Sequence, residues 1–299
     1  MQNHNSSTST LPLLIATLAV IGNLSQSLAN SDKTATYWEG QSYSQNSTVQ
    51  YSQAKHLISQ IPFTGSDRVL DIGCGDGKIT LEIAAQLKNG GSIQGIDLSP
   101  SMLKVARALL EKTKVPNASF NFVDVLKLDA LNQYDKIVSF STFHWITDQK
   151  LAFMKIRDAL KPGGKAYLLF NGDHGKKAPM ELAIERAIQR PYWNVFLNGK
   201  GSGEINSTPS FLTDGIEKAD LILNRLDAVR MDETFENRIA FMNWISGWMT
   251  SLKYLTPEDR PKFLNGIIDD YLQQVPLLKN GKILFYEYIM EIEVEKKTK

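Results

Sequence analysis

The sequence predicts an α/β fold in which helices cover both faces of a mostly parallel sheet. Between residues 67 and 171, five apolar strand-like runs alternate with helix-like segments whose apolar residues recur every three or four positions. This alternation favours a parallel sheet with right-handed crossovers, in which ligands bind at the carboxyl ends of the strands. The first three runs end in Asp71, Asp97 and Asp124. We therefore expect a polar site at that edge of the sheet.

A glycine-rich loop follows the first of these strands, in the run VLDIGCGDGK at positions 69–78. Gly73, Gly75 and Gly77 let the backbone turn sharply and approach a ligand closely. A dinucleotide site is the main alternative, but its usual spacing is G-x-G-x-x-G. The carboxylate of Asp71 beside the loop would repel a pyrophosphate and attract a cation. S-adenosylmethionine, which carries a sulfonium and an ammonium group, fits these residues.

The second and third strand runs place further acids on the same edge. Asp97 ends the run 92–97, and Ser99 is expected to cap the helix that follows. Asp97 lies about 20 residues beyond the glycine loop, where a carboxylate can hold the two hydroxyls of an adenosine ribose. Asp124, after the third run, could accept a hydrogen bond from an adenine amino group, with the Val125 amide beside it. The alternative for Asp124 is an acid that caps the turn after its strand.

The fourth and fifth strands are expected at 135–140 and 165–170, with a helix capped by Thr147 between them. Residues 141–145 read STFHW and directly follow the fourth strand. The fifth run is almost entirely apolar, as expected for a strand that is covered on both faces. Glutamates alternate with apolar residues near 282–294, which predicts a half-buried strand at the edge of the sheet.

We expect a single domain over residues 30–299, built on a core at 67–171 and completed by strands near 221–231 and 282–294. The other segments are expected to form an N- and C-terminal helical lid over the site, as small-molecule enzymes often have. The lid segments are 36–61, 176–215 and 234–280, with helices expected at 176–198, 234–249 and 257–274.

Residues 1–29 differ in composition from the rest of the chain. An apolar run at 11–22 is followed by Ser27-Leu28-Ala29, a pattern typical of a signal peptide cleaved after Ala29. The run is too short to span a bilayer. The first ten residues contain no lysine or arginine, so a leader that is never processed is the alternative. Cytoplasmic and exported locations both stay open, and residues 1–29 are left out of the predicted fold.

Charge and cysteine content exclude several classes of protein. The 33 basic and 32 acidic residues give a net charge of +1, without a basic stripe that would indicate nucleic-acid binding. The single cysteine, Cys74, excludes an intramolecular disulfide and a cysteine-cluster metal site. Cys74 could be a reactive thiol, but a small residue tolerated in a tight loop is the simpler interpretation.

Three motifs resemble those of class I S-adenosylmethionine-dependent methyltransferases: VLDIGCGDG at 69–77, GIDLSPSM at 95–102 and LKPGG at 160–164. The resemblance covers roughly residues 36–295 and implies a Rossmann-like sheet of seven strands with the last one antiparallel. It also implies S-adenosylmethionine as the cofactor. The implied contacts are Gly73, Cys74 and Gly75 around the methionine part with Asp71 and Ser141 beside it, Asp97 on the ribose, Leu98 and Met102 against the adenine, and Asp124 with Val125 at the adenine amine.

The stretch at 139–145 and the pattern W-x4-Y-x6-Q at 38–50 resemble juvenile hormone acid and trans-aconitate methyltransferases more narrowly. This resemblance implies a small organic acid as the methyl acceptor, with Gln50, His144 and Trp145 holding its carboxylate. A carboxylate with a pKa of ~4 to 5 is already ionised at neutral pH and needs no general base. With a phenol or hydroxyl acceptor, His144 would be a candidate base. The structural alternative is a His144–Trp145 pair that only packs beneath the lid.

Two other functions stay open. The protein could methylate a phenol, a hydroxyl or an amine, or it could be a cofactor-binding or exported interaction protein that no longer catalyses. The intact loop and the three acids argue against a loss of catalysis. Cofactor binding without turnover over a broad panel of acceptors would favour it.

Overall fold

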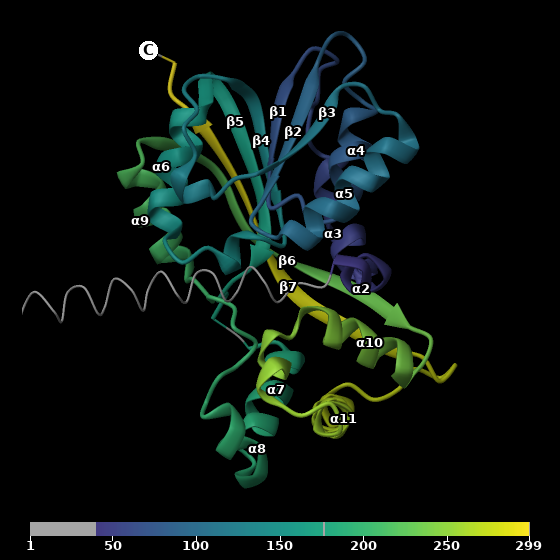
Figure 1. Cartoon of the computed structure of the whole chain (residues 1–299). Coiled ribbons are helices and arrows are strands. Elements are labelled where there is room, and N and C mark those ends of the chain that lie inside the picture. The colour runs from purple at the N-terminus through teal and green to yellow at the C-terminus, as the bar shows by residue number, and fades with distance from the viewer. Residues whose placement is uncertain (1–39, 176, 299) are drawn as a thin grey trace, which may run out of the picture.

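The computed structural model describes residues 40–175 and 177–298, which form a seven-stranded sheet flanked by helices (Figure 1). The strands are β1 (Arg68–Ile72), β2 (Ser92–Asp97), β3 (Ala118–Phe122), β4 (Tyr134–Phe140), β5 (Leu160–Asn171), β6 (Leu221–Phe235) and β7 (Ile283–Lys296). The α-helices are α2 (Gly40–Asn46), α3 (Thr48–Ile58), α4 (Lys78–Ala84), α5 (Pro100–Thr113), α6 (Gln149–Ala159), α7 (Pro179–Gln189), α8 (Pro191–Leu197), α9 (Pro209–Lys218), α10 (Arg238–Trp248) and α11 (Asp259–Gln274). The predicted leader and the first residues of the predicted lid, 36–39, lie outside the described residues.

The strand order β3-β2-β1-β4-β5-β7-β6 confirms the predicted α/β fold class with a Rossmann-like, mostly parallel sheet. β1 to β5 run parallel, and β7 is antiparallel to both of its neighbours. The predicted edge position of the last strand is wrong, because β7 lies between β5 and β6 and β6 forms the edge. Alternation of apolar and acidic residues indicates which face of a strand is buried, but it does not indicate which strands are its neighbours in the sheet. Glu291 of β7 is only 1% exposed, and its Oε2 lies 3.0 Å from Nη2 of Arg225 on β6.

Short-range capping signals set the ends of the helices that flank the site. Ser99 caps α5 as predicted, since its Oγ accepts a hydrogen bond from the Met102 N–H at 3.3 Å. α6 is capped by Asp148 and not by the predicted Thr147. The Oδ1 atom of Asp148 accepts from the Leu151 N–H at 2.9 Å. An aspartate and a threonine are both good caps, so adjacent candidates cannot be separated by residue type alone.

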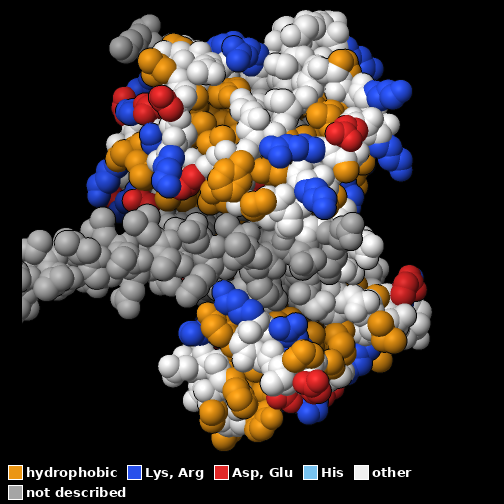
Figure 2. All heavy atoms as spheres, viewed as in Figure 1, with side chains coloured by type: hydrophobic (Ala, Val, Ile, Leu, Met, Phe, Trp, Pro, Cys, Tyr) orange, Lys and Arg blue, Asp and Glu red, His pale blue; other side chains and the backbone are white. Residues whose placement is uncertain are grey.

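The helix predicted at 176–198 is two helices. Pro191 begins α8, and its missing N–H and ring prevent α7 from continuing through it. α8 packs through Trp193 and Leu197, and Figure 2 shows apolar side chains gathered over it at the lower end of the molecule. The exposed apolar residues of α8 are Tyr192, Val195 and Phe196. Within the described parts of the chain, no helix combines the length and the apolar character that crossing a membrane requires.

Two helical layers cover the two faces of the sheet (Figure 1). On one face α6 and α9 pack against the sheet through a core that includes Phe153 and Ile137. On the other face α3 and α4 pack through Ile83 and Val138. Ile137 and Val138 are consecutive in β4 and face opposite layers, because side chains alternate along a strand. This two-sided burial fixes the carboxyl ends of β1, β2 and β4, from which the site is built.

β6 and β7 extend beyond the other strands into a second group of helices. β5 pairs with β7 as far as Asn171, opposite Ile289, whereas β6 and β7 stay paired as far as Phe235 and Ile283. α7, α8, α10 and α11 gather around this extension, below the rest of the sheet in Figure 1. We call these helices and the strand ends 231–235 and 283–287 the helical cap. Its core is rich in aromatic residues, including Phe241, Trp244, Tyr271 and Phe285.

Candidate functional site

The glycine-rich loop joins β1 to α4 and is bonded to the end of β2. The N–H groups of Gly73 and Cys74 both donate to the Ile96 carbonyl oxygen, at 2.8 and 3.0 Å. Gly73 has a φ of +75°, and a Cβ added there would lie 2.1 Å from Oγ1 of Thr142. Backbone conformation and space therefore both exclude a side chain at this position.

Gly75 is the least crowded of the three glycines in this loop. Its φ is +53°, and the nearest atom to an added Cβ is Cε1 of Tyr43, 4.0 Å away. At Gly77 an added Cβ would instead lie 2.6 Å from Cζ of Phe120. Gly75 is thus the glycine of this loop whose backbone a ligand can approach, as the sequence predicts for a cofactor loop.

Cys74 is buried and packs against β2. An added Cβ at Gly95 would lie 2.8 Å from Cβ of Cys74, so the small side chain fills the space that the glycine leaves. Burial, followed by the charge of Asp71, raises the pKa of the Cys74 thiol well above its usual value. A protonated, buried thiol is a poor nucleophile, which favours the interpretation of Cys74 as a packing residue.

Asp71 lies beneath the loop, at the end of β1. It is 1% exposed, and its Oδ2 accepts a hydrogen bond from Oγ1 of Thr80 at 2.6 Å. Burial raises the pKa of Asp71 to about 7, the Thr80 hydrogen bond opposes this shift, and the charge of Asp97 adds to it. A cation bound nearby would favour the ionised form of this carboxyl group.

Asp97 ends β2 next to the loop, and both of its oxygens already accept backbone hydrogen bonds. Oδ2 accepts from the Gly75 N–H at 2.9 Å, and Oδ1 accepts from the Ser99 N–H at 2.7 Å. Burial raises the pKa of Asp97, while these hydrogen bonds lower it. Each carboxylate oxygen can accept more than one hydrogen bond, so this orientation leaves acceptor capacity for two ribose hydroxyls.

The predicted adenine-side residues lie around the ends of β2 and β3. Leu98 is 39% exposed, whereas Met102 and Val125 are buried. Asp124 caps a short 3-10 helix, with its Oδ1 accepting from the Leu126 N–H at 2.9 Å. The capping interpretation of Asp124 is therefore realised, and its Oδ2 is 4.0 Å from the amine of Lys127.

Two cavities meet at the carboxyl ends of β1 and β4. The smaller, of about 50 Å³, surrounds the loop and includes Asp71, Gly73, Cys74 and Gly75. The larger, of about 620 Å³, lies between the sheet and the helical cap and includes His144 and Trp145. Both cavities are lined by Tyr43, Gln50 and Ser141. The predicted cofactor and acceptor residues are thus brought to one junction, while Asp97, Leu98, Met102, Asp124 and Val125 line neither cavity.

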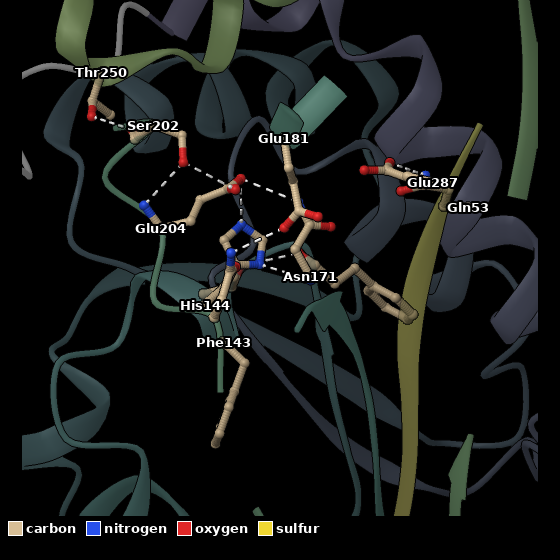
Figure 3. A network of polar contacts seen from close by, with 12 residues as sticks. Gln53, Phe143, His144, Asn171, Glu181, Ser202, Glu204, Thr250 and Glu287 are labelled. Carbon is tan, nitrogen blue, oxygen red and sulfur yellow. Dashed lines mark hydrogen bonds and ion pairs between the residues drawn. The ribbon is translucent and has the colours of Figure 1, made fainter. Parts of the chain in front are cut away.

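His144 is buried at the floor of the larger cavity, and Figure 3 shows its surroundings. Its Nδ1 accepts a hydrogen bond from the Asn171 N–H at 3.2 Å, which places the proton of the neutral ring on Nε2. Nε2 lies 3.6 Å from Oε1 of Glu204. Burial lowers the pKa of His144 to about 3. In this state the ring can donate a hydrogen bond, but it has no free lone pair with which to act as a general base.

Gln50 reaches the junction from α3. Its Oε1 accepts from Nε1 of Trp244 at 3.3 Å, and its amide nitrogen has no hydrogen-bond acceptor among the described residues. Trp145 lies beside His144, with ring centroids 5.1 Å apart. Trp248 lines the same cavity, and its buried Nε1–H also has no acceptor within the described part of the chain. The cavity thus offers N–H donors from three different elements.

Two glutamates complete the larger cavity, and sequence reasoning missed both. Glu204 lies in the loop between α8 and α9, and Glu287 lies on β7 in the helical cap. Burial raises the pKa of Glu204 to about 7 and that of Glu287 to about 8. In the sequence, Glu204 sits in a glycine-rich loop and Glu287 in an alternating strand, so neither position carries a signal of burial beside a site.

The described residues contain no group of histidine, cysteine, aspartate and glutamate side chains that could hold a metal ion.

Comparison with known proteins gives the chain a family. Residues 64–171 match a family model described as a methyltransferase domain. The chain is 24% identical over 255 residues to trans-aconitate 2-methyltransferase of Rhizobium leguminosarum, which covers 83% of this chain and 94% of that protein. It is 37% identical over 110 residues to juvenile hormone acid O-methyltransferase of Bombyx mori, covering 36% of this chain and 38% of that protein.

A solved structure supports the same fold. The YcgJ protein of Bacillus subtilis superposes with a TM-score of 0.58 at 18% identity, covering 83% of this chain and all of that one (100%). At that identity the likeness concerns the fold, which agrees with the strand order and the loop at the end of β1. The sequence matches, the loop geometry and the fold together show that the chain is a class I S-adenosylmethionine-dependent methyltransferase.

Proposed function

We propose that this methyltransferase transfers a methyl group to a carboxylate oxygen of a small organic acid. The observation that carries the proposal is the junction of the two cavities, where Gln50 lines both and its amide nitrogen has no acceptor among the described residues. Two relatives named for acid substrates, trans-aconitate and juvenile hormone acid, support the same class of acceptor.

The cofactor would occupy the smaller cavity and the edge of the sheet beside it. Gly73, Cys74 and Gly75 would hold the methionine part with Asp71 and Ser141, and Asp97 would bind the ribose. Leu98, Met102, Asp124 and Val125 would contact the adenine. The uncrowded backbone of Gly75 and the acceptor capacity of Asp97 fit this assignment. When bound, the cofactor supplies an electrophilic methyl group on a sulfonium.

The acceptor would occupy the larger cavity. Gln50, Trp145 and the Nε2–H of His144 would donate hydrogen bonds to its carboxylate and orient one oxygen toward the smaller cavity. Such alignment can contribute about 7 to 11 kcal/mol at best. An ionised carboxylate needs no general base, which agrees with a buried, neutral His144. We further propose that the helical cap acts as the lid that keeps water from this junction.

A second candidate is methyl transfer to an amine, favoured by a different observation. Glu181, Glu204 and Glu287 line the larger cavity, and ionised carboxylates would attract a cationic amine. The amine would have to lose its proton before attack, and a glutamate with a raised pKa could accept it.

Acids, alcohols and amines that share a carbon skeleton distinguish the two proposed functions. The protein is incubated with methyl-labelled S-adenosylmethionine and with octanoate, octanol, octylamine, benzoate, benzyl alcohol, benzylamine or trans-aconitate. We expect label in products that release it on alkaline hydrolysis, as methyl esters do. Label found solely in base-stable products of alcohols or amines would overturn the carboxylate proposal.

A matched pair of variants tests the acceptor position of Gln50. Gln50→Glu replaces the amide N–H donor by an anion at the junction, whereas Gln86→Glu makes the same change in the exposed turn after α4. We expect acid methylation to fall by at least about 10-fold in Gln50→Glu, because one charge-assisted hydrogen bond contributes roughly 1.5–3 kcal/mol. Equal activity in the two variants would remove Gln50 from the acceptor site.

A further inference from the structure

The larger cavity collects negative side chains without matching positive ones. Glu181, Glu204 and Glu287 line it together with Glu185 and Lys177. Lys177 is the one lysine or arginine among the described lining residues, and its amine pairs with Oε1 of Glu185 at 2.5 Å. If all the carboxyl groups were ionised, an acidic acceptor would meet a repulsive field.

Glu287 is tied to the sheet side of the cavity and keeps one oxygen available. Its Oε1 accepts from Nε2 of Gln53 at 2.6 Å, while Oε2 has no hydrogen-bond partner among the described residues. Figure 3 shows Glu287 and Gln53 bonded to each other beside β7. Burial raises the pKa of Glu287 to about 8, and the charges of Glu204 and Glu181 add to the shift. This shift favours the neutral carboxyl group, whose O–H is a hydrogen-bond donor.

Glu204 faces the same space from the loop before α9. Its Oε1 accepts from Nδ2 of Asn171 at 3.2 Å and lies 3.6 Å from Nε2 of His144. Its Oε2 accepts from Oγ of Ser202 at 3.2 Å (Figure 3). These neutral donors position the carboxyl group without supplying a positive charge, and burial raises its pKa to about 7.

Other titratable groups also face the cavity. His144 is held neutral, and the ring of His174 packs on Tyr288 with centroids 4.4 Å apart. The remaining titratable lining residues are Tyr43, Lys177, Glu181 and Glu185. Oε1 of Glu181 accepts from Nδ2 of Asn206 at 3.1 Å, and its Oε2 accepts from the Ala178 N–H at 2.7 Å, so it is engaged at the start of α7.

From this arrangement we infer that Glu204 and Glu287 determine acceptor specificity by binding the acceptor carboxylate as neutral carboxylic acids, which donate O–H hydrogen bonds to it. The inference rests on the proposed function, since it requires an acidic acceptor. No covalent step is added: each proton stays on its glutamate, and the acceptor remains ionised for attack. The cavity binds an acid well below the pKa values of the two glutamates and repels it once they ionise.

The test compares pH profiles of the full-length enzyme with octanoate, benzoate and trans-aconitate as probes. For any acid that is methylated, KM of the wild type is expected to rise about 10-fold from about pH 6 to about pH 9. This is the change expected when binding of the acceptor raises the pKa of one carboxyl group by about one unit. Glu287→Gln and Glu204→Gln keep the shape and a donor but cannot ionise. Each is expected to flatten the rise while leaving KM near pH 6 within about threefold of wild type. Glu236→Gln, on an exposed side chain, should behave as wild type.

The possible results separate the inference from the proposed function. Ester formation with a KM that is indifferent to pH overturns the inference alone. A Glu287→Gln variant that loses acid methylation even near pH 6 also overturns it, because the ionised form would then be the working one. Absence of ester from all three acids overturns the proposed function and the inference with it.

A second measurement needs no turnover. Infrared titration of the protein without acceptor is expected to show a protonated carboxyl absorption near pH 7 that weakens in Glu287→Gln and is unchanged in Glu236→Gln. An absorption near pH 7 that is the same in the wild type and in both cavity variants overturns the inference.

Discussion

Asp97 carries two backbone hydrogen bonds that fix where its carboxylate points. The Gly75 and Ser99 N–H groups hold the two oxygens from the loop and from the start of α5. Asp124, by contrast, uses its carboxylate to cap a turn of its own segment. The two acids are therefore expected to differ in how much cofactor affinity depends on them.

Asp97→Asn is predicted to weaken S-adenosylmethionine binding by about 10- to 100-fold, since hydrogen bonds to a charged group contribute roughly 1.5–3 kcal/mol. The new side-chain amide would also place an N–H group against the backbone N–H of Gly75 or Ser99, and this repulsion would loosen the loop. Isothermal titration calorimetry measures the effect, with Asp124→Asn as the matched control, expected to lose less affinity. Equal losses in the two variants would contradict the assignment of Asp97 to the ribose.

The buried acids also predict how stability depends on pH. The raised pKa of Glu287, about 8, means that the folded chain holds this proton more tightly than the unfolded chain does. The stability it contributes is fully present below the ordinary pKa of 4.5 and is lost as the pH rises through about 8. Glu204 and Asp71 act in the same direction up to about 7. His144 acts oppositely, but only between about 3 and 6.5.

Between about pH 6.5 and about pH 8.5, these carboxyl groups therefore lower the stability as the pH rises, while His144 no longer opposes them. The free energy of unfolding, measured by urea denaturation, is predicted to fall over this interval in the wild type and to fall less in Glu287→Gln. Glu236→Gln, whose side chain is 71% exposed, should retain the wild-type slope. A slope that is unchanged in Glu287→Gln would place its pKa in the ordinary range.

The sequence indicates which residues lie together where a polar side chain adjoins a recognisable backbone signal. Asp71 and Gly75 adjoin a loop with its own spacing, and the structure places both beside the smaller cavity. Glu204 and Glu287 come to the larger cavity through long-range packing, from a loop and from β7. Burial, which changes their chemistry, is a property of the fold that no local pattern of the sequence contains.

At the scale of elements, the three glycines of the loop have different reasons to be glycine. Gly73 is closed off by Thr142, Gly77 by Phe120, and Gly75 by neither. Gly90 has a positive φ of +83° and nothing within 4 Å of an added Cβ, so it isolates the cost of backbone conformation. Substitutions at these glycines can therefore distinguish an effect on stability from an effect on cofactor affinity.

Gly90→Ala is predicted to cost about 1–2 kcal/mol of stability, the cost of a left-handed alanine. Gly75→Ala should cost a similar amount of stability but also weaken S-adenosylmethionine binding, because its Cβ would occupy the ligand space. Gly73→Ala should destabilise most, since Thr142 must also move. Urea denaturation and calorimetry on the three variants give the comparison, and unaltered cofactor affinity in Gly75→Ala would contradict the loop assignment.

The order of strands and helices was predicted well because each element carries a local period or cap. The predicted edge position of the last strand was wrong, because the pattern within one strand does not indicate which other strands pair with it. β7 pairs with β6 over its whole length and with β5 over residues 289–295. The division of the helix predicted at 176–198 was visible in Pro191, but its consequence for the cavity depends on how α7 meets the sheet.

At the scale of the whole molecule, the paired strands β6 and β7 connect the cofactor-side sheet to the helical cap (Figure 1). Gln53 bonds to Glu287 and Gln50 bonds to Trp244, so α3 is attached to the cap at the larger cavity. Binding of the acceptor should therefore depend on the packing of the cap more strongly than binding of the cofactor does.

Phe285→Ala tests this coupling. Phe285 is 1% exposed, and its ring lies 4.5 Å from that of Trp244, so its removal is expected to cost about 3–5 kcal/mol of stability. Phe153→Ala, in the core between α6 and the sheet, should cost a similar amount. Below the unfolding transition, both variants should bind S-adenosylmethionine with nearly wild-type affinity, while KM for the acceptor rises only in Phe285→Ala, because Phe285 lines the larger cavity. An equal rise of KM in Phe153→Ala would mean that acceptor binding follows overall stability and not the packing of the cap.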